Sequence, residues 1–244
     1  ARTHPLTGDR IQVLRGLVDK DPAFNTVPDP ALQERFVRAK AKLSGYLSEP
    51  KRTLTAFPPS DNSVAAHYAR AYAYHKDARV DLALAETDAL LALEPENPWF
   101  LELKGQVLLE SGRPVDSLVP LRRATELTNA HPLIAGLLGH ALIATEDKAN
   151  FAEAENVLRA SVQRDRYNPF AWYQLGVVYA ERGDIPRAQL ASAEQQVMNR
   201  LYPEALRSAA AAEAALPYGS ADWIRAQDVA LEARGELERL RKKR

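Results

Sequence analysis

The sequence has 244 residues, of which 46% are hydrophobic and 26% are charged, with 32 basic and 32 acidic side chains. A formal net charge of +0 gives no overall attraction to nucleic acid or anionic lipid, so neither is an expected partner. The absence of cysteine excludes disulfides, a thiolate nucleophile and cysteine-ligated metal sites. The longest mainly apolar run, residues 133–144, falls short of the roughly 18 residues of a transmembrane helix, and no such segment is expected.

The first part of the chain, residues 1–63, contains two predicted amphipathic helices at 6–20 and 30–48. The breaker-rich stretch DPAFNTVPDP separates them. No signal peptide is predicted, and an opening of ARTHPLTGDR without methionine is typical of the interior of a longer polypeptide. We interpret residues 1–63 as a linker followed by capping helices.

Proline-marked helix starts recur through the middle of the sequence, at Pro98, Pro132, Pro169 and Pro203. The intervals are 34, 37 and 34 residues, and a step of 34 back from Pro98 reaches Val64. A period of 34 is that of the tetratricopeptide repeat, a helix–turn–helix unit. The sequence therefore predicts an all-α solenoid with four repeats over residues 64–201. An ordinary helical bundle whose prolines fall at these intervals by chance is the alternative.

Small residues recur in the same register, which supports the repeat. Two helices can approach closely only where their facing side chains are small. The small residues predicted at helix contacts are Ala71, Gly105, Gly139, Gly176 and Ala210, followed by Ala83, Ser117, Ala154 and Ala188. Gly112 and Gly183 are predicted to turn the chain between paired helices, because a left-handed cap favours glycine. Asn or His before the prolines can cap the next helix.

Residues 202–244 are predicted to form two C-terminal capping helices. EALRSAAAAEAAL favours a helix by propensity, and a turn and a long final helix follow it. Ser220 or Asp222 can cap the final helix, and Trp223 is expected to pack on the array. Such atypical ends cover the apolar faces that a stack of repeats otherwise exposes.

The sequence contains none of the common catalytic motifs. Its five histidines stand at 4, 67, 75, 131 and 140, so no pair has the spacing of a His-Glu-x-x-His zinc helix. Phosphate-binding loops, dinucleotide-binding glycines and a nucleophile elbow are also missing. We predict no catalytic residue, metal site or cofactor within this chain. The final LERLRKKR is interpreted as a solvated basic end.

The remaining candidate for function is the concave surface of the solenoid, which the first helix of each repeat lines. Groove positions lie one, four, eight and eleven residues after each start. Those of the first two units are Ala65, Tyr68, Tyr72, His75, Trp99, Glu102, Gln106 and Leu109, and those of the next two are Leu133, Gly136, His140, Ile143, Phe170, Tyr173, Val177 and Ala180. This mainly aromatic and apolar groove indicates a protein or peptide partner. His140 is expected to line the groove or pack rather than bind a ligand. Alternatively to an open groove, the flanking helices cover some of the aromatic residues.

Three segments resemble a known family. RTHPLTGDRIQVLR at 2–15, residues 100–124 and ADWIRAQDVALEARGELERL at 221–240 resemble periplasmic zinc metallopeptidases typified by the β-barrel assembly-enhancing protease. In that family a His-Glu-x-x-His domain precedes a Thr-His-Pro segment and tetratricopeptide repeats. The resemblance implies that this chain is the C-terminal region of such a protein, that residues 1–63 include the end of its peptidase domain, and that zinc belongs to the upstream domain.

The same resemblance implies a periplasmic location and a role for the repeats beside the peptidase. The leading hypothesis is a non-catalytic module that binds substrates or assembly partners for the protease. One alternative is an intramolecular scaffold that packs on and regulates the peptidase cleft, and another is a zinc endopeptidase fragment with a residual hydrolytic role. His4 of the Thr-His-Pro segment either approaches the upstream metal or only caps and packs.

Overall fold

The computed structural model describes residues 7–27 and 29–242, and within these ranges it is helical, without a β-strand. None of the helices described there combines the length and apolar character needed to cross a bilayer. In chain order the elements are α1 (Thr7–Val18), η1 (Pro22–Asn25), α2 (Pro30–Leu47), α3 (Pro50–Ala56), α4 (Val64–Lys76), α5 (Val80–Leu93), α6 (Pro98–Glu110), α7 (Pro114–Leu127), α8 (Pro132–Ala144), η2 (Lys148–Asn150), α9 (Phe151–Arg164), α10 (Pro169–Glu181), α11 (Ile185–Met198), α12 (Tyr202–Ala215) and α13 (Ala221–Lys242).

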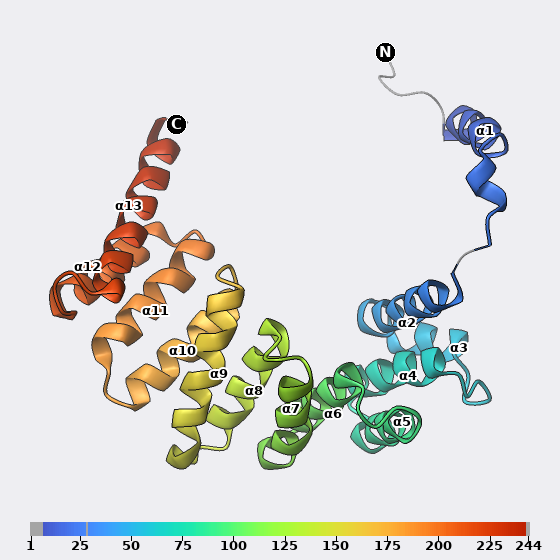
Figure 1. The fold of residues 1–244 in the computed structure, drawn as a ribbon, viewed down its shortest axis with the longest axis horizontal. Helices are drawn as coiled ribbons and strands as arrows, with labels where there is room; N and C mark the ends of the chain where they lie inside the picture. The colour runs from blue at the N-terminus through green and yellow to red at the C-terminus, as the bar shows by residue number, and fades with distance from the viewer. Residues whose placement is uncertain (1–6, 28, 243–244) are drawn as a thin grey trace.

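From α4 onward the helices pack as successive pairs, and each second helix also packs against the first helix of the next pair. The pairs follow one another along a curved array, as Figure 1 shows. The predicted all-α solenoid is confirmed, with helix starts at Val64, Pro98, Pro132 and Pro169 as the spacing indicates. Residues of α4, α6, α8 and α10 line one shared hollow, so the first helices form the inner side of the curve.

Polar side chains cap several of these helices as expected. The side-chain oxygen of Asn97 accepts a hydrogen bond from the backbone N–H of Trp99 at 3.0 Å. Asn168 accepts one from Ala171 at 3.1 Å. The predicted cap by His131 is wrong, because its side chain makes no such bond. Its ring instead packs edge-on against Trp99 of the preceding repeat, with 5.3 Å between ring centroids.

The predicted turn glycines both adopt left-handed backbone, with φ of +76° at Gly112 and +78° at Gly183. Each turn closes with a hydrogen bond from the residue after the glycine to a carbonyl five residues earlier, as in Arg113 to Leu108. This is the helix-ending pattern that a left-handed residue permits. The first repeat uses Ala78 there with φ of +55°, although a side chain disfavours this conformation.

The small residues at helix contacts have different amounts of room. A Cβ built on Gly105 would lie 2.4 Å from Leu121 Cγ, and one on Gly139 would lie 2.4 Å from Leu158 Cγ. At Gly176 the nearest atom is Ala191 Cβ at 3.5 Å, an ordinary contact distance. Close approach therefore requires glycine in the second and third repeats, whereas the fourth has room for alanine.

The main hydrophobic core runs through the second to fourth repeats. Leu121, Leu138, Leu158 and Leu175 are among its fully buried side chains. Tyr179 is also buried in it, and Trp172 is partly buried against it. Both aromatic side chains therefore belong to the packing between helices. Burial of large apolar side chains supplies most of the stability of such a stack.

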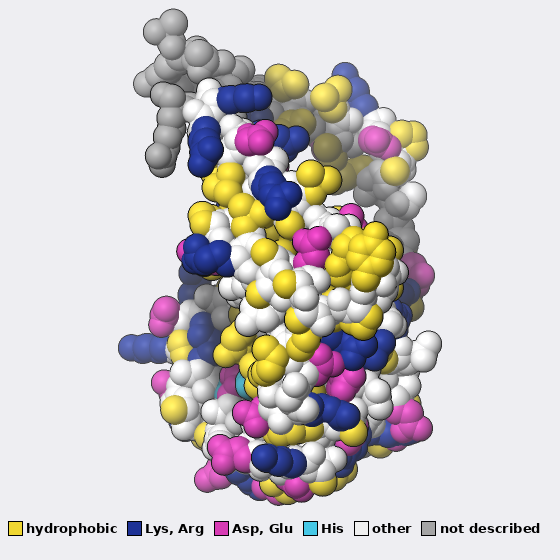
Figure 2. All heavy atoms as spheres, turned by 90° about the vertical axis from the view of Figure 1, so that its left-hand side faces the viewer, with side chains coloured by type: hydrophobic (Ala, Val, Ile, Leu, Met, Phe, Trp, Pro, Cys, Tyr) yellow, Lys and Arg dark blue, Asp and Glu magenta, His cyan; other side chains and the backbone are white. Residues whose placement is uncertain are grey.

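Helices α12 and α13 form one more antiparallel pair at the C-terminal end. The Ser220 hydroxyl accepts a hydrogen bond from Trp223 N–H at 3.2 Å, which confirms one of the two predicted caps. Trp223 packs against a small cluster that includes Leu190 and Leu216. Figure 2 faces this end and shows hydrophobic side chains interspersed with side chains of both charges.

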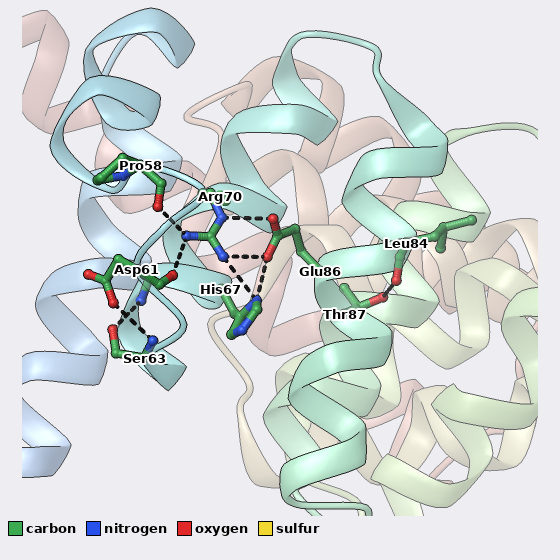
Figure 3. Close-up of polar contacts among 9 residues, drawn as sticks. Pro58, Asp61, Ser63, His67, Arg70, Leu84, Glu86 and Thr87 are labelled. Atoms are coloured by element: carbon green, nitrogen blue, oxygen red, sulfur yellow. Dashed lines mark hydrogen bonds and ion pairs between the residues drawn. The ribbon is translucent and has the colours of Figure 1, made fainter.

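A buried arginine fixes the loop between α3 and α4 (Figure 3). Arg70 is 1% exposed and donates to both carboxylate oxygens of Glu86, at 2.7 and 2.9 Å. Its Nη1 donates to the backbone oxygens of Pro58 at 3.0 Å and Asp61 at 2.7 Å. Every part of the guanidinium is therefore used to join this loop to α4 and α5, and the cluster is structural.

Candidate partner-binding groove

The inner side of the array contains a hollow of about 370 Å³ between α2 and the first helices. Five of the predicted groove residues line it, namely Tyr72, Glu102, Gln106, Leu133 and Phe170. Four further residues that the repeat register did not predict also line it, namely Leu137, Lys42, Leu43 and Tyr46. Leu137 follows Leu133 by four residues on α8, a spacing that could have identified it.

Large apolar side chains remain exposed along the first helices of the second to fourth repeats. The exposed fraction is 39% for Trp99, 63% for Leu133, 43% for Phe170 and 57% for Tyr173. Val177 is half-buried one turn further along α10. These four exposed side chains belong to three successive inner helices, and we call them the open row. Partner surfaces are commonly built around such aromatic and apolar groups.

His140 lies beside the open row and contacts one of its aromatic side chains. Its ring packs edge-on against Phe170, with 5.5 Å between centroids. Burial lowers the pKa of His140, and the carboxylate of Glu110 only partly opposes this. A half-buried, packed imidazole fits the expectation that His140 lines the groove.

Polar side chains form a short network next to these apolar groups. His75 Nε2 lies 2.6 Å from Glu110 Oε2, and Gln106 Nε2 donates to Glu110 Oε1 at 2.8 Å. The hydrogen bond from His75 lowers the pKa of Glu110. Glu110 was absent from the predicted set, although it follows Gln106 by four residues on α6 and shares its face. His75 and Gln106 are thus held by a partner within the chain.

Two of the three tyrosines predicted to line the groove are covered. Tyr68 is 4% exposed and Tyr72 is 3% exposed, because α2 packs across them. The cover is close because α2 presents Gly45 there: a Cβ on Gly45 would lie 2.6 Å from the Ala69 carbonyl oxygen and 2.8 Å from Tyr72 Cβ. The expectation that both tyrosines face an open groove is therefore corrected, since neither is accessible while α2 is in place.

Lys42 of α2 lies among three aromatic side chains, two of which α2 covers. Its Nζ is 5.8 Å from the ring centroids of Tyr68 and Tyr72 and 5.7 Å from that of Trp99. It is also 3.8 Å from Glu102 Oε2. Burial raises the pKa of Glu102, and the positive charge of Lys42 opposes this change. Glu102 thus belongs to the covered part of the groove.

One turn earlier on α2, Arg38 makes a second basic contact. It donates to both oxygens of Glu94, at 3.0 and 2.5 Å, and its guanidinium carbon lies 5.9 Å from the Phe100 ring centroid. The hydrogen bond from Arg38 lowers the pKa of Glu94. A cavity of about 460 Å³ lies between α2 and α6 at this point. Basic residues of α2 therefore meet acidic and aromatic residues of the array twice.

Within residues 7–27 and 29–242 there is no group of three His, Asp or Glu side chains that could hold a metal ion. His67 is tied to Glu86 and Arg70 in the structural cluster of Figure 3. His4, the candidate contact to an upstream metal, lies outside the described residues. The arrangement on the inner side is suited to binding.

Comparison with solved structures finds proteins with a similar fold. It is similar to MamA protein, with a TM-score of 0.53 and 20% identity over 73% of this chain and 94% of that chain. It is similar to YrrB, described as a TPR protein with an unusual peptide-binding site, with a TM-score of 0.55 and 22% identity over 70% of this chain and 89% of that chain.

A MamA fragment from Desulfovibrio magneticus RS-1 gives a TM-score of 0.54 and 18% identity over 69% of this chain and 94% of that chain. Comparisons with protein-family models and with curated protein sequences find no match. At these identities the similarity shows the fold, and the chain has a tetratricopeptide-type solenoid.

Proposed function

We propose that this chain is a protein-interaction module whose inner groove binds a segment of another protein, and that it has no catalytic role itself. The observation that carries the proposal is the open row, in which Trp99, Leu133, Phe170 and Tyr173 expose large apolar surfaces on three successive inner helices. Isolated exposed apolar residues are normal, but a row of them beside a hollow marks a binding surface.

The geometry favours a peptide or helix over a small ligand. The row crosses three repeats. The adjoining hollow of about 370 Å³ is lined by α2 on one side and by the inner helices on the other. An apolar, extended surface matches the way in which short segments dock into helical grooves. The description of YrrB as having a peptide-binding site supports this assignment by analogy.

We further propose that the module serves a periplasmic zinc metallopeptidase domain encoded upstream. The support is the resemblance of residues 2–15 and 221–240 to that family. In this proposal zinc belongs to the upstream domain, His4 lies at the junction, and the repeats recruit substrates or assembly partners. The residues encoded before Ala1 test the assignment, because a His-Glu-x-x-His helix there is required.

A second candidate function, intramolecular packing on the peptidase domain, is favoured by α1. This helix exposes Val13, Leu14 and Leu17 by 64%, 56% and 64%. Such a face is suited to contact with a neighbouring domain. Deletion of the repeats from the full-length protein distinguishes the two functions. If the repeats pack on the peptidase domain, their deletion alters the cleavage of short peptides. If they recruit substrates, their deletion alters only which proteins are cleaved.

Groove binding itself is tested with a displayed library of random peptides selected on the purified chain. The selected peptides are then titrated by fluorescence anisotropy against the wild type and a Phe170→Ala, Tyr173→Ala double variant. We expect a loss of affinity of at least about tenfold in the double variant, since each truncation removes a large apolar contact. Tyr218→Ala is the matched control, because Tyr218 is 88% exposed in the turn before α13. Equal loss in the control contradicts groove binding.

A further inference from the structure

Helix α2 is itself seated in the groove, and its contacts show what the covered part of the groove binds. It packs on α4 through Ala41, which is 1% exposed, and through Gly45, which leaves no room for a Cβ. Its opposite side is exposed, with Phe36 and Leu47 at 60% and 70%. Helix α2 therefore packs on the array by one face, and its last carbonyl groups accept hydrogen bonds from Lys76 and Thr53.

The residues beneath α2 form a site for a positive charge. Tyr68, Tyr72 and Trp99 surround Lys42 Nζ, and Glu102 supplies a carboxylate that is mostly buried. Aromatic faces and a carboxylate together attract a cation, and removal of water strengthens both interactions. One helical turn earlier on α2, Arg38 pairs with the acidic Glu94, so this neighbouring position also favours a positive charge.

Lys42 fills this site loosely. Its distances of 5.7 and 5.8 Å from the ring centroids are close to the outer limit of about 6 Å for a cation–π contact. Its ion pair with Glu102 spans 3.8 Å, beyond hydrogen-bond distance. Within the described part of the chain, Glu102 Oε2 is buried without a hydrogen-bond donor. A cation that comes closer than Lys42 can donate to this oxygen and compete.

The C-terminal end of α2 is held by hydrogen bonds to its last carbonyl groups: Lys76 Nζ donates to Tyr46 O at 2.9 Å and Ser48 O at 2.8 Å, and Thr53 Oγ1 donates to Ser44 O at 3.1 Å. Only Ser48 and Glu49 separate α2 from α3, and α3 has its own contacts with α4. On the other side, residues 19–29 link α2 to α1, whose apolar side chains are exposed. If the Lys76 hydrogen bonds break, movement about residues 48–49 would uncover Tyr68, Tyr72 and Glu102 without a change within the repeat pairs.

We infer that the covered part of the groove is a binding site for a basic helix of a partner protein, with α2 as its resident and displaceable occupant. The inference rests on the proposed function and specifies the partner: its helix presents a lysine or arginine beside small residues, as α2 presents Lys42 between Ala41 and Gly45. Apolar residues further along the partner then reach the open row.

A peptide of residues 30–47 tests this inference, because it carries the contacts of α2 in a separate molecule. The peptide is labelled with fluorescein and titrated against the full chain as wild type, Gly45→Ala and Gly235→Ala. Gly235 is the control, since it is helical and a Cβ added to it would have no neighbouring atom within 4 Å. We expect Gly45→Ala to bind the peptide roughly tenfold more tightly than the other two, because its own α2 no longer competes.

The charge requirement is tested with peptide variants. Lys42→Gln in the peptide should weaken binding by about fivefold through loss of the cation–π contacts and ion pair, whereas Lys40→Gln should not, since Lys40 is exposed. Lys42→Gln in the chain is a second way to release α2, with no added bulk, and should also increase affinity for the unmodified peptide. Circular dichroism confirms that each chain variant keeps its helical content.

Three results would overturn the inference: equal peptide affinity for all the chains, no effect of Lys42→Gln in the peptide, or self-association of Gly45→Ala without peptide, which assigns the site to a second copy. The proposed function is tested separately. Library peptides that depend on Phe170 and Tyr173 while the 30–47 peptide fails to bind would leave groove binding in place and remove only the basic-helix assignment.

Discussion

Gly105 of α6 faces Leu121 of α7 so closely that a Cβ on the glycine would lie 2.4 Å from Leu121 Cγ. Leu121 is fully buried, so it cannot move aside without disturbing the core. We expect Gly105→Ala to destabilise the chain by about 1–2 kcal/mol, because overpacking outweighs the gain in helix propensity. Urea unfolding followed by circular dichroism measures the change.

Gly176 provides the matched comparison, since the nearest atom to a Cβ there is 3.5 Å away. Gly176→Ala gains helix propensity without a clash and should be neutral or more stable by up to about 1 kcal/mol. If both alanine variants change the unfolding free energy in the same direction, the difference in helix approach between these repeats is not real.

Ala78 occupies the left-handed turn position that glycine fills at 112 and 183, and its side chain is exposed. Ala78→Gly removes backbone strain without loss of packing and should stabilise the chain by about 1 kcal/mol. This corresponds to a rise of roughly 2–4 °C in the thermal midpoint. Ala211→Gly, at an exposed position of helix α12, should have the opposite sign. A fall in the midpoint for Ala78→Gly would contradict the assigned turn.

Glu194 of α11 and Arg225 of α13 join the C-terminal helix to the array. Glu194 is 2% exposed, and Arg225 donates to both of its oxygens, with Nη2 2.7 Å from Oε2. Arg225→Met leaves a buried carboxylate without its partner and should cost about 3 kcal/mol. The double variant Glu194→Gln, Arg225→Met removes the charge as well and should recover part of that loss. No recovery in chemical unfolding would argue against the pair.

The pKa of His140 is lowered in the folded chain, so the unfolded chain binds its proton more readily. The contribution of His140 to the free energy of unfolding is complete above its pKa in the unfolded chain, about 6.5. This contribution is lost as the pH falls through its pKa in the folded chain. Stability should therefore decline as the pH falls below about 6.5, and His140→Gln should reduce that slope. Unfolding free energies at several pH values test this, and parallel curves for the two proteins would exclude the assigned burial effect.

The repeat region could be predicted from the sequence because its constraints are local. Proline at helix starts, small residues at contacts, and Gly112 and Gly183 at turns each act within one helix pair, so the spacing alone located them. His131 was misassigned as a cap because the same pattern also suits an aromatic contact with Trp99, which belongs to the preceding repeat.

Whether a flanking helix covers the groove could not be decided from the sequence, because the repeat register describes the repeats alone. Helix α2 lies outside the repeats, and its position across Tyr68 and Tyr72 depends on a contact between distant segments. Gly45 inside a predicted amphipathic helix was a possible signal, since glycine is unfavourable there unless another backbone approaches. The location of Lys42 among three rings follows only from the packed structure.

Binding of a partner segment to the inner face can be measured by single-cysteine labelling, because the chain contains no cysteine. Leu133→Cys places a thiol in the open row, and Val119→Cys places one on α7, where the native side chains are 63% and 74% exposed. A saturating library-selected peptide should slow the reaction of iodoacetamide with the Leu133→Cys variant at least about tenfold and leave the Val119→Cys variant unchanged. Protection of Val119→Cys alone, or of neither variant, would contradict binding to the inner face.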